Sequence, residues 1–214
     1  MRKLVLSAAV AVMGMIGMNA QNLNTEALQI GARAGYNMSN LRGDTPEGLD
    51  TKSLSGFHAG LFVEVPVSER FSVQPEVIYS TQGAKTEGEF LGVNGSTELK
   101  TQYINVPVLA KFYIADGFNI QAGPQIGFLT GAEYESKVGS ISTTVDDATD
   151  GMKGTDFGLL LGAGYKAPMG LTIDARYNLG LSNVYDEDSD MFENVGTDND
   201  FKNGVFQVGI GYQF

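Results

Sequence analysis

Apolar and polar residues alternate in eight segments of about ten residues each. Such a period of two is typical of β-strands, because successive side chains of a strand point to opposite faces. In the first segment, for example, Leu28, Ile30 and Ala32 share one face while Gln29, Gly31 and Arg33 share the other. The segments are 28–36, 56–65, 71–80, 103–112, 118–128, 156–166, 171–182 and 206–214. The sequence therefore predicts an all-β fold of eight antiparallel strands.

The lengths of the connections decide between the two folds that alternation permits, a soluble β-sandwich and a membrane β-barrel. Three connections are short and four are long, in strict alternation. The short ones are 66–70, 115–117 and 167–170, and the long ones are 38–54, 84–98, 131–154 and 183–203. This pattern is that of an up-and-down outer-membrane barrel with short periplasmic turns and long external loops.

Aromatic residues gather at both ends of the apolar faces. Those beside the long connections are Tyr36, Phe57, Tyr79, Phe128, Phe157 and Phe206, and those beside the short turns are Phe71, Phe112, Phe118, Tyr165, Tyr212 and Phe214. Two aromatic girdles separated by aliphatic residues are expected where a barrel crosses both interfaces of a membrane. The apolar face is therefore predicted to meet lipid.

The opposite face carries equal numbers of cationic and anionic side chains. They are Arg33, Lys111, Lys166 and Arg176, together with Glu64, Glu76, Asp156 and Asp174. An eight-stranded barrel is only wide enough for its own side chains, so we expect these residues to form an ion-pair network that plugs the lumen. Within it, Lys166 and Asp174 are expected to pair diagonally across a short turn, with Arg176 one step further.

Three prolines lie within the predicted strands, at Pro75, Pro107 and Pro124. Proline lacks the amide hydrogen that a strand donates to its neighbour. A closed barrel has no free edge to accommodate it, so each proline is expected at a bulge or at an unpaired position of a ladder.

Residues 1–20 have the organisation of a signal peptide. Arg2 and Lys3 precede an uncharged apolar stretch from Leu4 to Met18, which is shorter than a membrane-spanning helix. Cleavage is expected after Ala20, which leaves a barrel domain of residues 21–214; the alternative is an N-terminal anchor helix.

Composition restricts the chemistry. The chain has no Cys and one His, so a thiolate centre and a multi-His metal site are excluded, and we expect no cofactor. Its net charge is −11, with no basic cluster, which argues against nucleic acid as a partner. Most of the acidic residues lie in the four long connections. The densest stretch, 186–190, begins like a calcium loop, but Met191 and Thr197 occupy the positions where an EF-hand has Gly and Glu.

Several segments resemble the PorT-like family of Bacteroidota outer-membrane β-barrel proteins. They are Gly31–Asn37, Tyr103–Tyr113, Gly123–Phe128 and Asp174–Leu181, together with the terminal sequence Gly-Tyr-Gln-Phe. The resemblance spans essentially the whole chain after residue 20. It implies an eight-stranded barrel like those of OmpA and OmpX, in the outer membrane of a Gram-negative bacterium, and implies little about activity.

Three functions remain open on the sequence alone. The first is a non-enzymatic outer-membrane protein that acts structurally or through acidic external loops, in contact with lipid, lipopolysaccharide and an extracellular or envelope protein partner. The second is an accessory protein of secretion or transport. The third is a small outer-membrane enzyme, for which His58 is the one candidate base; no nucleophile accompanies it in the sequence.

Overall fold

The computed structural model describes residues 28–43, 49–90, 93–138, 141–146, 148–149, 151–184 and 201–214. All the regular elements in these ranges are β-strands, and no helix among them is long and apolar enough to cross a membrane. The strands are β1 (Gln29–Arg42), β2 (Leu49–Ser68), β3 (Phe71–Phe90), β4 (Val93–Tyr113), β5 (Phe118–Val138), β6 (Ile141–Asp146), β7 (Thr155–Lys166), β8 (Leu171–Gly180) and β9 (Lys202–Gln213). The predicted signal peptide lies outside the described residues.

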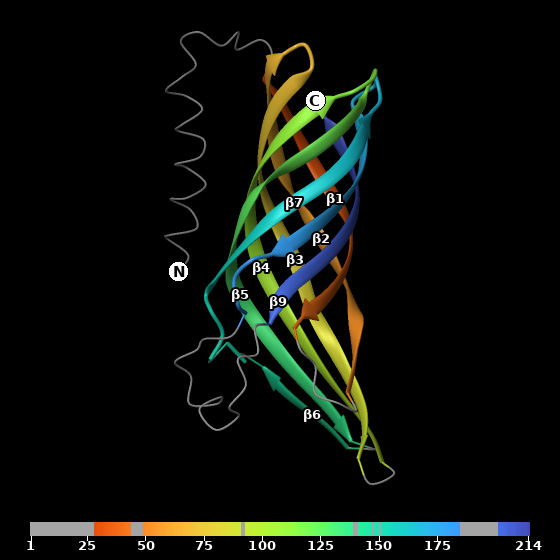
Figure 1. Cartoon of the computed structure of the whole chain (residues 1–214), viewed down its shortest axis with the longest axis vertical. Coiled ribbons are helices and arrows are strands. Elements are labelled where there is room, and N and C mark those ends of the chain that lie inside the picture. The colour runs from red at the N-terminus through yellow and green to blue at the C-terminus, as the bar shows by residue number, and fades with distance from the viewer. Residues whose placement is uncertain are drawn as a thin grey trace.

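Eight of these nine strands close into a ring. The order is β4-β3-β2-β1-β9-β8-β7-β5, and a further pairing of β4 with β5 completes the circle. All the pairings are antiparallel, and β1 joins β9 along twelve Cα pairs, from Gly31–Gln213 to Arg42–Lys202. The predicted eight-stranded barrel is therefore confirmed, and Figure 1 shows its strands tilted around one axis.

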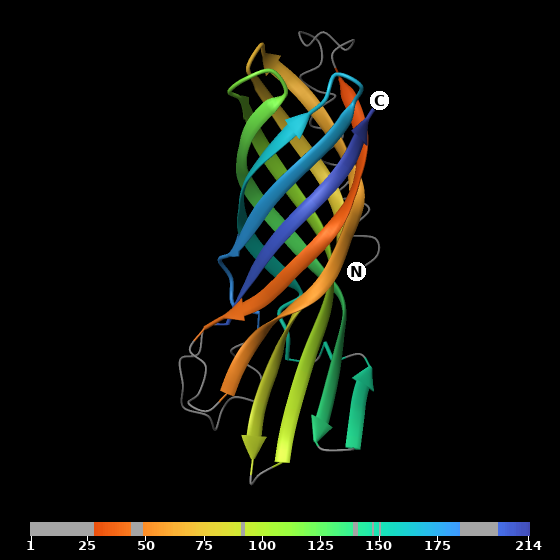
Figure 2. The same cartoon turned by 90° about the vertical axis from the view of Figure 1, so that its right-hand side faces the viewer.

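The three short turns lie together at one end of the barrel, beside the C-terminus (Figure 2). They join β2 to β3, β4 to β5 and β7 to β8, as the sequence predicts. Two of them contain a glycine in the left-handed region, Gly117 with φ of 75° and Gly170 with φ of 89°. Residues with a Cβ rarely adopt such angles, which favours glycine at these positions.

At the other end, four strands continue well beyond the ring. The predicted long connections 38–54, 84–98 and 131–154 are therefore wrong in part, because residues 38–42, 49–54, 84–90, 93–98, 131–138 and 141–146 are strand. The continuations of β2, β3, β4 and β5 pair in that order, and β6 adds a fifth strand next to β5 (Figure 2). A strand of 20 residues, such as β3, spans roughly 65 Å, more than a tilted strand needs to cross a bilayer. Backbone pairing of these strands therefore continues beyond the membrane, through segments whose side chains are polar on both faces of the sheet.

The prolines lie where the ladders are interrupted, as predicted. Pairing of β3 with β4 stops at Pro75–Val108 and resumes at Ile78–Asn105, which leaves Pro107 unpaired with β3. Pairing of β4 with β5 stops at Pro107–Gln125 and resumes at Ala110–Ala122, around Pro124. The register is the same on both sides of each gap, so the missing donors do not shift the strands.

The outward face is apolar and its aromatic residues cluster at both ends. Phe57 and Tyr79 lie with ring centroids 5.8 Å apart near the extended end, and Phe118 and Tyr165 lie 4.6 Å apart near the short turns. Aliphatic residues such as Leu61, 63% exposed, lie between the two levels. An exposed apolar band of this kind is stable only in contact with lipid.

Candidate functional site: the charged layers of the lumen

Four charged side chains from three strands meet across the middle of the barrel. Arg33 of β1 contacts Glu76 Oε2 of β3 through Nη1 at 3.3 Å, and Asp174 Oδ1 of β8 through Nη2 at 2.5 Å. Arg176 of β8 contacts the same two oxygens, through Nη1 at 2.8 Å and through Nε at 2.9 Å. Two guanidinium groups thus alternate with two carboxylates, and all four side chains are buried.

A second charged layer lies nearer to the short turns. Lys111 Nζ donates to Glu64 Oε2 at 3.0 Å and to Gln74 Oε1 at 2.9 Å. Glu64 also accepts hydrogen bonds from the Tyr113 hydroxyl at 2.5 Å and from Gln213 Nε2 at 3.1 Å. The Glu64 carboxylate therefore has three donors, one of them cationic, which offsets the cost of burying its charge.

Six of the eight predicted residues are in these two layers, and the other two lie elsewhere. Lys166 does not pair with Asp174, so this prediction was wrong: Asp174 contacts two guanidinium groups, and the Lys166 ammonium donates to Gln29 Oε1 at 2.7 Å. Asp156 contacts no cation among the described residues, and accepts hydrogen bonds from Ser182 Oγ at 2.7 Å and Asn203 Nδ2 at 3.1 Å.

Neutral partners of the charged groups were not predicted from the sequence. Gln74, Tyr113 and Gln213 complete the layer around Glu64. Their inward positions follow from alternation, but which polar group each one meets depends on strands that are distant in the sequence.

His58 lies above the central layer and is 1% exposed. Its Nδ1 is 2.7 Å from Asn37 Oδ1, and Asn37 Nδ2 donates to Ser80 Oγ at 2.9 Å. The His58 imidazole therefore contacts the Asn37 amide. The Ser80 hydroxyl accepts a hydrogen bond from the same amide and, among the described residues, makes no hydrogen bond to the imidazole.

Glycine makes room for the central layer. A Cβ added at Gly209 of β9 would lie 2.6 Å from Arg33 Nη2 and 3.2 Å from His58 Nε2. Contacts of 2.6 Å are too close for real side chains, so the guanidinium occupies the space that a larger residue would need. A cavity that borders both layers, with Arg33, Lys111 and Asp174 in its lining, has a volume of about 20 Å³, room for about one water molecule.

Outside the ring, charged residues pair across the outward face of the extended sheet. Lys85 contacts Glu98 of the facing strand and Glu87 of its own strand, and Lys52 also contacts Glu87. Hydrogen bonds from Lys52 and Lys85 lower the pKa of the Glu87 carboxyl, and the hydrogen bond to Glu98 raises the pKa of the Lys85 ammonium. These are solvated cross-strand pairs, which contribute little to stability individually.

Removal of the Asp174 carboxylate is expected to weaken the central layer but to leave its contacts with Glu76 in place. In the Asp174→Ala variant both guanidinium groups keep Glu76 and lose one carboxylate. The Asp174 side chain is 8% exposed and that of Glu76 is 0% exposed, so we expect a smaller loss in the free energy of unfolding than for a fully buried partner, about 2 kcal/mol. Urea unfolding of the barrel in lipid vesicles measures the loss. The matched control is Asp116→Ala, on an exposed turn, and an unchanged urea midpoint for Asp174→Ala would contradict the buried pairing.

A closed ring of antiparallel strands, an apolar outward band and short turns at one end define an outer-membrane β-barrel protein. Residues 19–186 match the model of the outer membrane protein beta-barrel domain family. The chain belongs to this family and is an outer-membrane protein of a Gram-negative bacterium. Among curated protein sequences, none matches it significantly.

Solved outer-membrane proteins are similar to the chain at low identity. Ail, the attachment invasion locus protein of Yersinia pestis, is 20% identical with a TM-score of 0.47, over 87% of this chain and 98% of Ail. Neisserial surface protein A is 13% identical with a TM-score of 0.49, over 86% and 97%. OprG of Pseudomonas aeruginosa is 14% identical with a TM-score of 0.44, over 88% and 96%.

The folded barrel is expected to migrate faster than the boiled chain on a denaturing gel. The ring retains its backbone pairing in detergent until heat opens it, because no strand edge in the ring is free to begin unzipping. The protein should likewise stay in the membrane fraction after extraction with high salt or carbonate. A single band regardless of heating, with the protein in the soluble fraction, would contradict this.

Proposed function

We propose that the protein is a non-enzymatic outer-membrane barrel with a closed lumen, which acts through the part of the chain outside the membrane. The observation that carries the proposal is the central layer of Arg33, Glu76, Asp174 and Arg176. These side chains come from β1, β3 and β8 and bridge the lumen, and the cavity beside them holds about one water molecule. Solutes would have to break several buried ion pairs to pass.

The external end of the barrel supports a role in binding partners outside the membrane and not in transport through the lumen. The extended sheet of β2 to β6 continues beyond the ring (Figure 2), and it carries acidic residues such as Glu87, Glu98 and Glu133. We propose that this end meets lipopolysaccharide and an extracellular or envelope protein partner. Within the family, the segments that resemble PorT-like proteins of Bacteroidota support an assignment to that group. The acidic stretch 186–190 lies outside the described residues.

Conductance of the barrel in a planar lipid bilayer tests the closed lumen. We expect no steady current across the purified, refolded protein. A stable channel in the unmodified protein would contradict the proposal and favour the alternative function, an accessory of transport.

A shortened external sheet tests where the function resides. Lys85 and Glu98 face each other in the β3–β4 hairpin, so residues 86–97 can be replaced by a two-residue Asn-Gly turn without a change of register. We expect this variant to insert and to show heat-modifiable migration, but to lose partners that a pull-down on intact cells recovers with the unmodified protein. Recovery of the same partners by both proteins would place the function elsewhere.

A further inference from the structure

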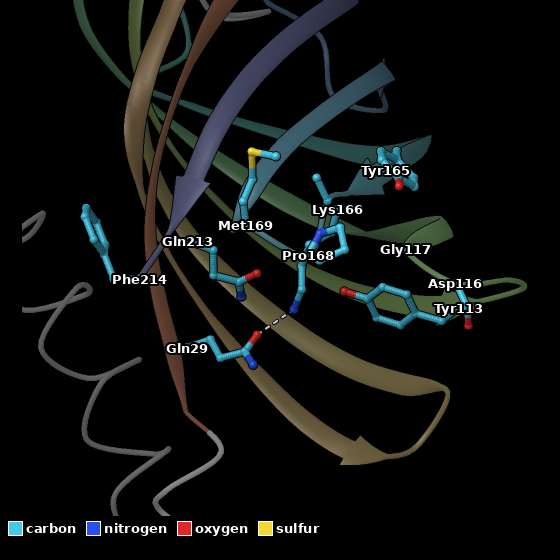
Figure 3. Close-up of a pocket in the computed structure, with 12 residues that line it drawn as sticks. Gln29, Tyr113, Asp116, Gly117, Tyr165, Lys166, Pro168, Met169, Gln213 and Phe214 are labelled. Atoms are coloured by element: carbon cyan, nitrogen blue, oxygen red, sulfur yellow. Dashed lines mark hydrogen bonds between the residues drawn. The ribbon is translucent and has the colours of Figure 1, made fainter.

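A vestibule of about 500 Å³ opens at the periplasmic end of the barrel (Figure 3). It is enclosed by the β4–β5 and β7–β8 turns, the first residue of β1 and the end of β9. Its volume is within the range of small-molecule sites. Tyr113 and Met169 are among its lining residues, and its charged lining side chains are Lys166 and Asp116.

Lys166 is the cation of this vestibule, and its hydrogen-bond partner is neutral. Its ammonium donates to Gln29 Oε1 at 2.7 Å, and in Figure 3 it lies where Gln29 and Gln213 converge. An ammonium has three donors. The Lys166 ammonium contacts the Gln29 amide. The carboxylate of Glu64 pairs with Lys111, and that of Asp174 pairs with Arg33 and Arg176. The charge of Lys166 is therefore available to a ligand in the vestibule.

Gln213 supplies an unmatched acceptor beside this cation. The residue is 6% exposed, its Nε2 donates to Glu64 Oε2 at 3.1 Å, and its Oε1 has no hydrogen-bond partner among the described residues. The carboxylate of Glu64 accepts hydrogen bonds, so the amide nitrogen must face it, and this sets the orientation of the amide. The Oε1 atom is therefore free to accept a hydrogen bond from a molecule that enters the vestibule.

We propose that the vestibule binds a small zwitterion of the amino-acid or dipeptide class from the periplasm. The ligand carboxylate would pair with the Lys166 ammonium, an N–H group would donate to Gln213 Oε1, and the ligand ammonium would face Asp116 at the rim. Inorganic phosphate fits less well, because as an anion it is repelled by Asp116 and it offers the Gln213 oxygen few donors.

Titration calorimetry of the purified full-length barrel in detergent tests this site. The probe is alanyl-alanine, compared with alanyl-alanine amide, which lacks the carboxylate, with N-acetyl-alanyl-alanine, which lacks the ammonium, and with inorganic phosphate. We expect saturable binding of alanyl-alanine and a loss of affinity of about tenfold or more for the amide. Absence of saturable binding, or phosphate binding as tightly as the dipeptide, would overturn the proposal.

Lys166→Gln tests the cation directly, because glutamine keeps a donor for Gln29 and removes the charge. We expect a loss of affinity for alanyl-alanine of about tenfold, with unchanged heat-modifiable migration. Lys52→Gln, an exposed cation outside the ring, should bind like the unmodified protein. A chain that lacks residues 21–27 separates a free ligand from a segment of the protein itself: a large gain in affinity on this deletion would overturn the proposal in favour of the segment.

Discussion

Deletion of residues 203–214 is expected to abolish insertion into the outer membrane. These residues form nearly all of β9, which pairs with β1 along twelve Cα pairs and with β8 along nine. Without them, both neighbouring strands expose unpaired amides and carbonyls to hydrocarbon, at several kcal/mol for each group. The truncated chain should be absent from the membrane fraction and should show no heat-modifiable band.

Removal of β6 provides the control for this deletion. β6 pairs with β5 alone among the described strands and lies outside the ring. A chain in which residues 139–147 are replaced by a short glycine linker should therefore insert and keep its heat-modifiable migration. Insertion of the chain that lacks 203–214 would show that β9 does not close the barrel.

Glu76→Gln is expected to destabilise the barrel more than any other single change in the lumen. The Glu76 carboxylate is fully buried; its Oε2 contacts Arg33 and Arg176, and its Oε1 accepts a hydrogen bond from Gln74 at 2.6 Å. The neutral amide leaves two buried guanidinium groups with Asp174 as their one carboxylate. Loss of a buried partner of this kind costs about 3–5 kcal/mol, measurable by urea unfolding in lipid vesicles.

A charge-balanced double variant separates loss of pairing from loss of packing. In Glu76→Gln/Arg176→Met, Arg33 and Asp174 remain as one cation and one anion. We expect this variant to recover part of the stability that Glu76→Gln loses, since the unpaired charge is gone. Glu87→Gln, on the solvated sheet, should leave the urea midpoint nearly unchanged. A double variant less stable than Glu76→Gln would contradict an electrostatic origin of the loss.

Alternation, the lengths of the connections and the positions of the aromatic residues together predicted the ring. They identified the eight strands, the faces that meet lipid and lumen, the three short turns and the prolines at ladder gaps. This succeeded because a lipid-facing strand must be apolar at every second residue, whatever its neighbours are. The same rule failed in parts of the predicted connections 38–54, 84–98 and 131–154, where the strands leave the membrane. Water accepts polar side chains on both faces there, so the alternation disappears while the backbone pairing continues.

Alternation assigned the eight charged candidates to the face opposite to the lipid. Which of these side chains meet depends on the closed ring. Arg33 and Asp174 are 141 positions apart and come together because β9 joins β1 to β8 in a fixed register. The sequence predicts Lys166 and Asp156 in the same network. In the structure Lys166 donates to Gln29 beside the periplasmic vestibule, and Asp156 accepts hydrogen bonds from neutral donors. A pairing across the lumen depends on the closure and register of the whole ring, which no local pattern of residues contains.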